Sequence, residues 1–192
     1  MNVGLVVEGA TDLATYPVFI RRIRNDLGEL QIRECGGSRL KNLFPKFLSE
    51  FDRNSAWRID LALVIRDSDC KAPQESEAKL REILRHCNFR RRFRVEVFAT
   101  PCMLESWLLS DVGAVAQVAA NRGRNPGTGL PEISIELRNS QSDKAVFLRV
   151  LARLGLPATP PVYAEIAQVA GLTVIENRCG YFREFRNRII RA

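Results

Sequence analysis

Two aspartates, Asp67 and Asp69, stand two residues apart just after the aliphatic run LALVI and one arginine. Apolar runs of this length usually build a buried strand, and buried strands avoid carboxylates. Glu8 follows another short apolar run near the N-terminus. Carboxylate oxygens are ligands that suit Mg²⁺ or Mn²⁺. The pattern therefore points to metal chemistry, provided that the fold brings the two strand ends together.

Hydrophobic periodicity predicts the strands and helices that would bring these acids together. Segments with helical spacing of apolar residues alternate with short apolar runs, and this order predicts a mostly parallel sheet covered on both faces. In such sheets ligands bind beyond the carboxyl ends of the strands, so Glu8 and the two aspartates would converge there. The predicted strands are residues 3–8, 30–35, 58–66 and 93–100.

A fourth carboxylate, Glu105, stands in the first turn of a helix predicted over 102–120, near the same edge of the sheet. Trp107 follows it at helical spacing with apolar residues, which favours a place in the core over base stacking. Converging anions raise one another's pKa unless a cation holds them, so this arrangement also calls for a metal ion.

Each acid alone has a simpler explanation. Asp67 or Asp69 could cap the following helix, as Thr11 or Asp12 could cap the first one. Glu105 could be an ordinary first-turn acid favoured by the helix dipole. The combination of these acids is more specific than any one of them, because a glutamate follows the first predicted strand and an Asp-x-Asp motif follows the third within one α/β domain.

Composition limits the possible functions. The net charge of +7, with 24 arginines among 29 basic residues, is compatible with a nucleic-acid partner. Five scattered cysteines without a CxxC pair argue against a zinc knuckle and fit a reducing cytoplasm. The single histidine, His86, is expected at a helix end rather than in catalysis. No apolar stretch is long enough for a membrane span, and the N-terminus lacks the pattern of a signal peptide, so we expect a cytoplasmic protein without membrane contact.

The second half of the chain differs from the first. Residues 121–132 are rich in Gly, Pro and Asn and predict a loop, which lacks the glycine and lysine spacing of a P-loop. Three helical segments follow. We therefore expect an α/β core over 1–120 and a helical extension over 121–192 that packs as a cap on the same domain.

The motifs VVEGATD and VIRDSDC resemble those of the Toprim fold, the catalytic domain of topoisomerases, primases and OLD-family nucleases. This family has a Glu-Gly pair after the first strand and an Asp-x-Asp after a later one. The resemblance is closer to the uncharacterised DUF4276 family of small bacterial Toprim-like proteins. Its pattern matches further segments along nearly the whole chain, namely ESWLLSD, SDKAVFL, VYAEIAQ and CGYFREF.

The resemblance implies metal-dependent phosphoryl transfer, most simply phosphodiester hydrolysis, in a setting such as phage defence or DNA repair. Asp67 and Asp69 would hold Mg²⁺ or Mn²⁺, and Glu8 would share the metal or act as general acid/base. Glu105 would hold a second ion. Lys144 would stabilise the charge of the transition state. Its simpler interpretation is a solvated helix lysine.

Other residues would support this site. Asp111 is expected to orient a neighbouring lysine or arginine. Arg66 is expected to neutralise part of the negative charge of the site. Arg39 could also contact phosphate. The arginine run could follow a nucleic-acid backbone, or form a solvated turn. Its members before the fourth strand are Arg90, Arg91 and Arg92.

Two other functions stay open. The first is a binding module without catalysis, which would keep a basic rim but splay its carboxylates or pair them with arginine. It would bind nucleic acid or protein beside a partner such as an ATPase. The second is a small nucleotide phosphohydrolase, which would need a closed pocket. The type of nucleic acid and the oligomeric state do not follow from the sequence.

Overall fold

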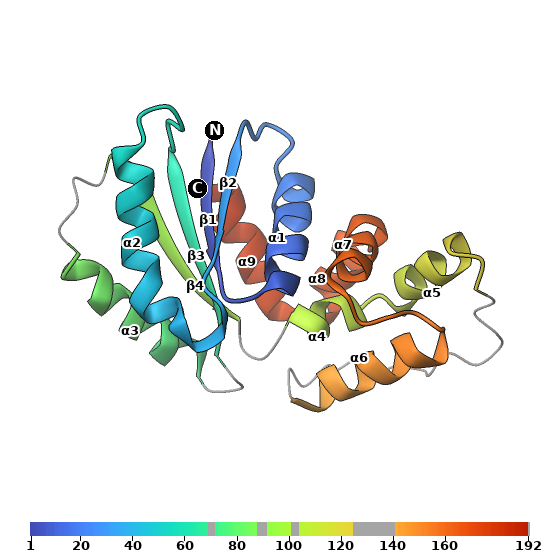
Figure 1. Ribbon diagram of the computed structural model, residues 1–192. Coiled ribbons are helices and arrows are strands. Elements are labelled where there is room, and N and C mark those ends of the chain that lie inside the picture. Colours follow the sequence, from blue (N-terminus) through green and yellow to red (C-terminus); the bar gives the residue numbers. More distant parts are fainter. Residues whose placement is uncertain (69–71, 88–91, 101–103, 125–140, 192) are drawn as a thin grey trace.

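A computed structural model describes residues 1–68, 72–87, 92–100, 104–124 and 141–191 (Figure 1). A four-stranded parallel sheet in the order β2-β1-β3-β4 forms its centre. The parallel sheet that strand–helix alternation predicts is thereby confirmed, and the carboxyl ends of its strands share one edge. The strands are β1 (Val3–Val7), β2 (Leu30–Glu34), β3 (Leu61–Asp67) and β4 (Arg94–Thr100).

Helices α2 (Leu40–Arg53) and α3 (Pro73–Arg85) cover one face of the sheet (Figure 1). Alternate strand residues, among them Val6 and Val64, point into this layer and pack against apolar side chains of both helices. Gly4 lets α2 approach closely, since a Cβ atom there would lie 2.6 Å from Cε2 of Phe51.

Helices α1 (Ala10–Ile23) and α9 (Gly180–Arg191) cover the other face. The intervening strand residues, such as Leu5 and Leu63, belong to this larger core. The rings of Phe98 on β4 and Phe185 on α9 lie 5.3 Å apart between their centres. The last helix is therefore part of the packing of the sheet.

The remaining helices lie beside the sheet (Figure 1). Arg22 of α1 joins them to it, because its Nη1 donates to the carbonyl oxygens of Ala167 and Ala170 at 2.5 and 2.6 Å. These bonds satisfy carbonyls at the end of α7, which no helical partner reaches. The group consists of α4 (Leu104–Leu109), α5 (Val112–Asn121), α6 (Gln141–Arg153), α7 (Pro160–Val169) and α8 (Leu172–Arg178).

The single helix expected over 102–120 is two helices, α4 and α5, within the described residues. Asp111 lies between them and caps α5 by accepting a hydrogen bond from the N–H of Ala114 at 3.2 Å. Such a capping bond favours a new helix start, although the apolar spacing runs on through the break.

Trp107 on α4 is only 1% exposed and packs edge-on against Tyr16 and Phe182, with ring centres 5.7 and 5.1 Å away. Its place is in the core, which leaves no face for a stacked base. None of the described helices has the length and apolar character that crossing a membrane requires.

Candidate functional site

The carboxyl edge of the sheet brings Glu8 and Asp67 together. Glu8 follows β1 directly, and Asp67 is the last residue of the adjacent strand β3. The backbone N–H of Asp67 donates to Oε2 of Glu8 at 3.3 Å. The predicted meeting of the two acidic motifs is thus present in the structure. Asp69 lies outside the described residues.

Glu8 also meets a cation. Nε of Arg66 lies 3.2 Å from Oε1 of Glu8, and the two side chains are only 16% and 18% exposed. Arg66 belongs to β3 and Glu8 follows β1 directly, so the ion pair links the carboxyl ends of two adjacent strands. Arg66 therefore neutralises Glu8, as its position next to Asp67 suggested.

The side chain of Asp67 is held from the neighbouring strand β4. Oγ1 of Thr100 donates to Oδ1 of Asp67 at 2.6 Å. Burial raises the pKa of Asp67 well above its ordinary value, and the charges of Asp12, Glu8 and Glu105 raise it further. The hydrogen bond from Thr100 opposes this shift. The carboxylate thus stands in a negative field with little solvent to relieve it.

Asp12 belongs to this group, although the sequence analysis considered it only as a helix cap. Its Oδ2 accepts the N–H of Gly9 at 3.0 Å, which places it in the first turn of α1. Burial raises the pKa of Asp12 to about 7, the charges of Glu8 and Glu105 raise it too, and the bond from Gly9 lowers it. The signal that could have identified it is its position four residues after Glu8, at the start of the helix that leaves the same strand.

Glu105 reaches the edge from α4 and is 6% exposed. Nζ of Lys144 on α6 lies 3.3 Å from its Oε1, and the hydroxyl of Tyr163 on α7 donates to the same oxygen at 3.3 Å. Burial raises the pKa of Tyr163 first, and the neighbouring charge of Glu105 adds to the shift. The structure therefore joins Glu105 and Lys144, which the sequence places 39 positions apart (144 − 105).

Asp111 binds backbone rather than side chains. One carboxylate oxygen accepts the N–H of Ala114, and the other accepts the N–H of Gly171 at 2.8 Å. No lysine or arginine partner of Asp111 is found in the part of the chain that the structure describes. Its carboxylate ties the start of α5 to the turn between α7 and α8, so it shapes the helices that carry Glu105 and Tyr163.

The basic residues divide between the two ends of the sheet. Arg39 ends the short 3₁₀ helix η1 (Gly37–Arg39), which follows β2 at the carboxyl edge, and its Nε donates to the carbonyl oxygen of Gly36 at 3.4 Å. Arg92 precedes β4 at the opposite end. Strands rise about 3.3 Å per residue, which puts the two ends of seven-residue β4 about 20 Å apart. Arg90 and Arg91 lie outside the described residues.

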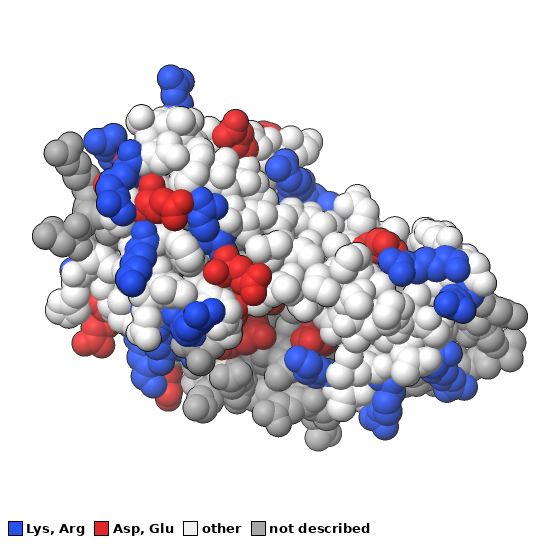
Figure 2. Space-filling view, viewed as in Figure 1, with Lys and Arg blue, Asp and Glu red and all other residues white. Residues whose placement is uncertain are grey.

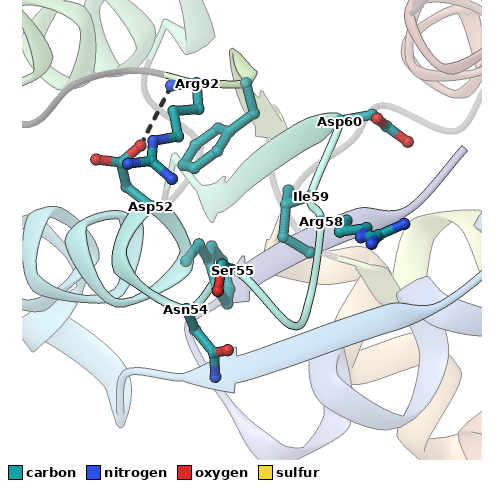
Figure 3. A pocket seen from close by; sticks show the side chains of 9 residues that line it. Asp52, Asn54, Ser55, Arg58, Ile59, Asp60 and Arg92 are labelled. Carbon is teal, nitrogen blue, oxygen red and sulfur yellow. Dashed lines mark hydrogen bonds between the residues drawn. The ribbon is translucent and has the colours of Figure 1, made fainter.

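Arg92 lines a cavity of about 300 Å³ at this far end, together with Asp52, Ser55 and Arg58 (Figure 3). Its backbone N–H donates to Oδ1 of Asp52 at 3.2 Å. The structure therefore does not bring Arg92 to the carboxylates. Any phosphate that it contacts lies at the other end of the sheet.

The arginines of α9 have acidic partners. Nη1 of Arg186 lies 2.8 Å from Glu176, and Nη1 of Arg188 lies 3.0 Å from Glu77. Figure 2 shows basic side chains over both the sheet and the α5–α7 part of this face, with acidic side chains among them. This distribution does not form a single basic stripe on the face that is shown.

The donor chemistry at the carboxyl edge fits a hard divalent cation. Its acids offer only oxygen ligands, and the pKa values of Asp12 and Asp67 are raised first by burial and then by the charges of neighbouring carboxylates. Among the described residues, no three side chains of His, Cys, Asp or Glu stand in a metal-binding group. Asp69, the remaining acid of the motif, is outside those residues.

Comparison with solved structures identifies the fold. The C-terminal region of the OLD protein of Xanthomonas campestris pv. campestris matches with a TM-score of 0.51 and 14% identity, over 98% of this chain and 94% of that chain. The C-terminal region of the Burkholderia pseudomallei OLD protein matches with a TM-score of 0.45 and 14% identity, over 96% and 98%. No family model matches the sequence, and the curated proteins give no match. The chain has the Toprim-like fold of the Xanthomonas region.

Proposed function

We propose that this protein is a Toprim-like nuclease that hydrolyses phosphodiester bonds with the help of Mg²⁺ or Mn²⁺. The observation that carries the proposal is the meeting of Glu8 and Asp67 at the carboxyl edge, where Asp12 and Glu105 are close enough to raise the pKa of Asp67. The fold likeness to an OLD protein region supports it. The ESWLLSD element supports a closer kinship with the DUF4276 family.

Asp67 and Asp69 would hold the metal ion, with Asp12 and Glu8 beside them. A divalent ion at this position supplies charge stabilisation for the leaving and attacking oxygens of an in-line displacement. Thr100 fixes the orientation of Asp67 through the 2.6 Å hydrogen bond, so that the carboxylate does not need to reorganise. Glu8 would share the metal ion or accept the proton of the attacking water.

Lys144 would hold the substrate phosphate. Its side chain is 46% exposed while its partner Glu105 is nearly buried, so the lysine lies at the border between solvent and the acidic cluster. A lysine in this place can contact a phosphate oxygen while Glu105 keeps it at the edge. Arg39, on the same edge of the sheet, would bind a neighbouring phosphate of the same strand.

One observation favours a second candidate, a nucleic-acid- or protein-binding module without catalysis. Glu8, the expected acid of the first motif, is paired with Arg66 at 3.2 Å. Such a pair neutralises a carboxylate that catalysis would need. A module of this kind would act beside a protein partner such as an ATPase.

A cleavage assay distinguishes the two candidates. Single- and double-stranded DNA and RNA are incubated with the protein and Mg²⁺ or Mn²⁺, and with chelator as control. Variants Asp67→Asn and Glu8→Gln remove charge with little change of shape, and Arg122→Gln, which alters a remote ion pair, serves as the matched control. A nuclease cleaves at least one substrate only with metal, and loses this activity in the two site variants. Binding without cleavage of any substrate would favour the module.

A further inference from the structure

Glu8 is held between a cation and a backbone N–H. Its Oε1 lies 3.2 Å from Nε of Arg66, and its Oε2 accepts the N–H of Asp67 at 3.3 Å. The register of β1 and β3 pairs Val6 with Val64, and Glu8 lies just beyond the end of β1. The contact at 3.2 Å places its carboxylate on the face of the sheet to which Arg66 points.

This face is not the one that Asp67 uses. Successive strand residues point to opposite faces, so Arg66 points to the α2–α3 layer while Asp67 points towards Thr100 and α1. Within the described parts of the chain, no three acids are grouped for a metal ion. The ion pair with Arg66 thus gives the carboxylate of Glu8 a partner that competes with a metal ion.

Arg66 itself is poorly satisfied. Its Nε is buried and forms no well-aligned hydrogen bond in the described structure, so its contact with Glu8 is an ion pair alone. A guanidinium group presents a planar fork of donors that matches a phosphate better than a single carboxylate oxygen. A phosphate that arrives at this edge therefore offers Arg66 a better partner than Glu8 does.

We propose that Arg66 is an exchangeable counter-ion, which occupies Glu8 until a phosphate group of the substrate draws it away. Release from Arg66 would free the carboxylate of Glu8 to join Asp67 as a metal ligand. This inference rests on the proposed metal-dependent function. Phosphate and divalent metal then strengthen each other's binding, and by thermodynamic linkage they do so equally. The ion pair would keep the affinity of the site for the metal ion low until nucleic acid is bound.

The test is Mn²⁺ titration calorimetry on wild type, Arg66→Met and Arg24→Met. Arg24 is the matched control, because it forms an ion pair with Asp26 after α1, away from the carboxyl edge, and its loss changes the net charge equally. Removal of the competing cation is expected to tighten Mn²⁺ binding about tenfold in Arg66→Met. The control is expected to change the affinity by less than about twofold.

Sulfate, a tetrahedral dianion, serves as the phosphate probe. When sulfate replaces chloride at constant ionic strength, wild type is expected to bind Mn²⁺ several-fold more tightly, and Arg66→Met to show no gain. Equal Mn²⁺ affinity in wild type and Arg66→Met would overturn the exchange and leave the metal site intact. No Mn²⁺ binding in any variant would overturn the metal-dependent function itself. If circular dichroism shows that Arg66→Met does not fold, the wild-type sulfate titration decides alone, and an absent gain overturns the proposal.

Discussion

Nζ of Lys144 lies 3.3 Å from Oε1 of Glu105, and this ion pair joins helix α6 to helix α4 at the carboxyl edge of the sheet. Glu105 is nearly buried and also accepts the hydroxyl of Tyr163, so three helices meet at one carboxylate. The contact fixes the position of these helices relative to the acids that follow β1 and β3. It also leaves the lysine partly exposed, where a phosphate can reach it.

Lys144→Met is expected to reduce both stability and activity. The change leaves the buried carboxylate of Glu105 without its cation, and we expect the free energy of unfolding to fall by about 1 kcal/mol because the lysine is partly exposed. Urea unfolding measures this value. Arg122→Met, which removes an exposed pair with Glu165, is expected to change it much less. Equal losses in both variants would show that the Lys144 pair is an ordinary surface contact.

Stability is expected to fall as the pH rises from about 4 to about 7, because the pKa of Asp12 is raised from 3.8 to about 7 in the folded protein. Between these pH values the folded protein keeps a proton on Asp12 that the unfolded chain has lost. The stability that this proton contributes is fully present below about pH 4 and is lost as the pH rises to about 7. Each unit of pKa shift corresponds to about 1.4 kcal/mol. Denaturant titrations across the window measure the slope.

Asp12→Asn is the matched variant for this pH dependence. It keeps the shape of the side chain and removes the titrating group, so the slope is expected to become shallower. Asp67, whose pKa is also raised, accounts for the remaining slope. If the free energy of unfolding of Asp12→Asn depended on pH as steeply as that of wild type, groups other than Asp12 would cause the pH dependence.

Thr100→Val is expected to weaken Mn²⁺ binding about tenfold, since outer hydrogen-bond partners orient the ligands of metal sites. Valine has nearly the volume of threonine but lacks the hydroxyl that donates to Asp67 at 2.6 Å. Thr100→Ser keeps the hydroxyl and is expected to retain most of the affinity. Calorimetry on both variants measures the difference. A valine variant that binds as tightly as the serine variant would show that this hydrogen bond does not position Asp67.

Asp111→Ala is expected to lower the free energy of unfolding by about 2 kcal/mol, because two backbone N–H groups lose their acceptor. These are the N–H groups of Ala114 and Gly171. Asp111→Asn keeps an acceptor oxygen and is expected to lose less. Mn²⁺ affinity is expected to stay near the wild-type value in the folded asparagine variant. A large loss of affinity there would give Asp111 a direct role at the site.

The sheet and its acidic edge could be predicted because the relevant signals are local. Apolar strands and amphipathic helices alternate along the chain, and parallel strands must end on one side. Glu8 and Asp67 follow from that geometry. Lys144 was placed at the site by the family pattern alone, and its contact with Glu105 was not predicted, since no local rule relates two separate helices.

Other features depend on contacts that no local pattern reveals. The break before α5 was missed because the apolar spacing continues through Ser110 and Asp111. Asp12 was interpreted as a cap, and its cap-like bond to Gly9 does exist, but its burial among other acids appears only in three dimensions. Arg92 was grouped with phosphate contacts by its charge, although its strand begins at the far end of the sheet.

Mn²⁺ titration calorimetry on wild type and on the double variant Asp67→Ala/Asp69→Ala tests the central claim most directly. We predict saturable binding to wild type, alone or with sulfate present, and its loss in a double variant that remains folded. This result would establish the carboxyl edge as a divalent-cation site. Absence of binding to wild type under both conditions, or equal binding to the double variant, would contradict the claim.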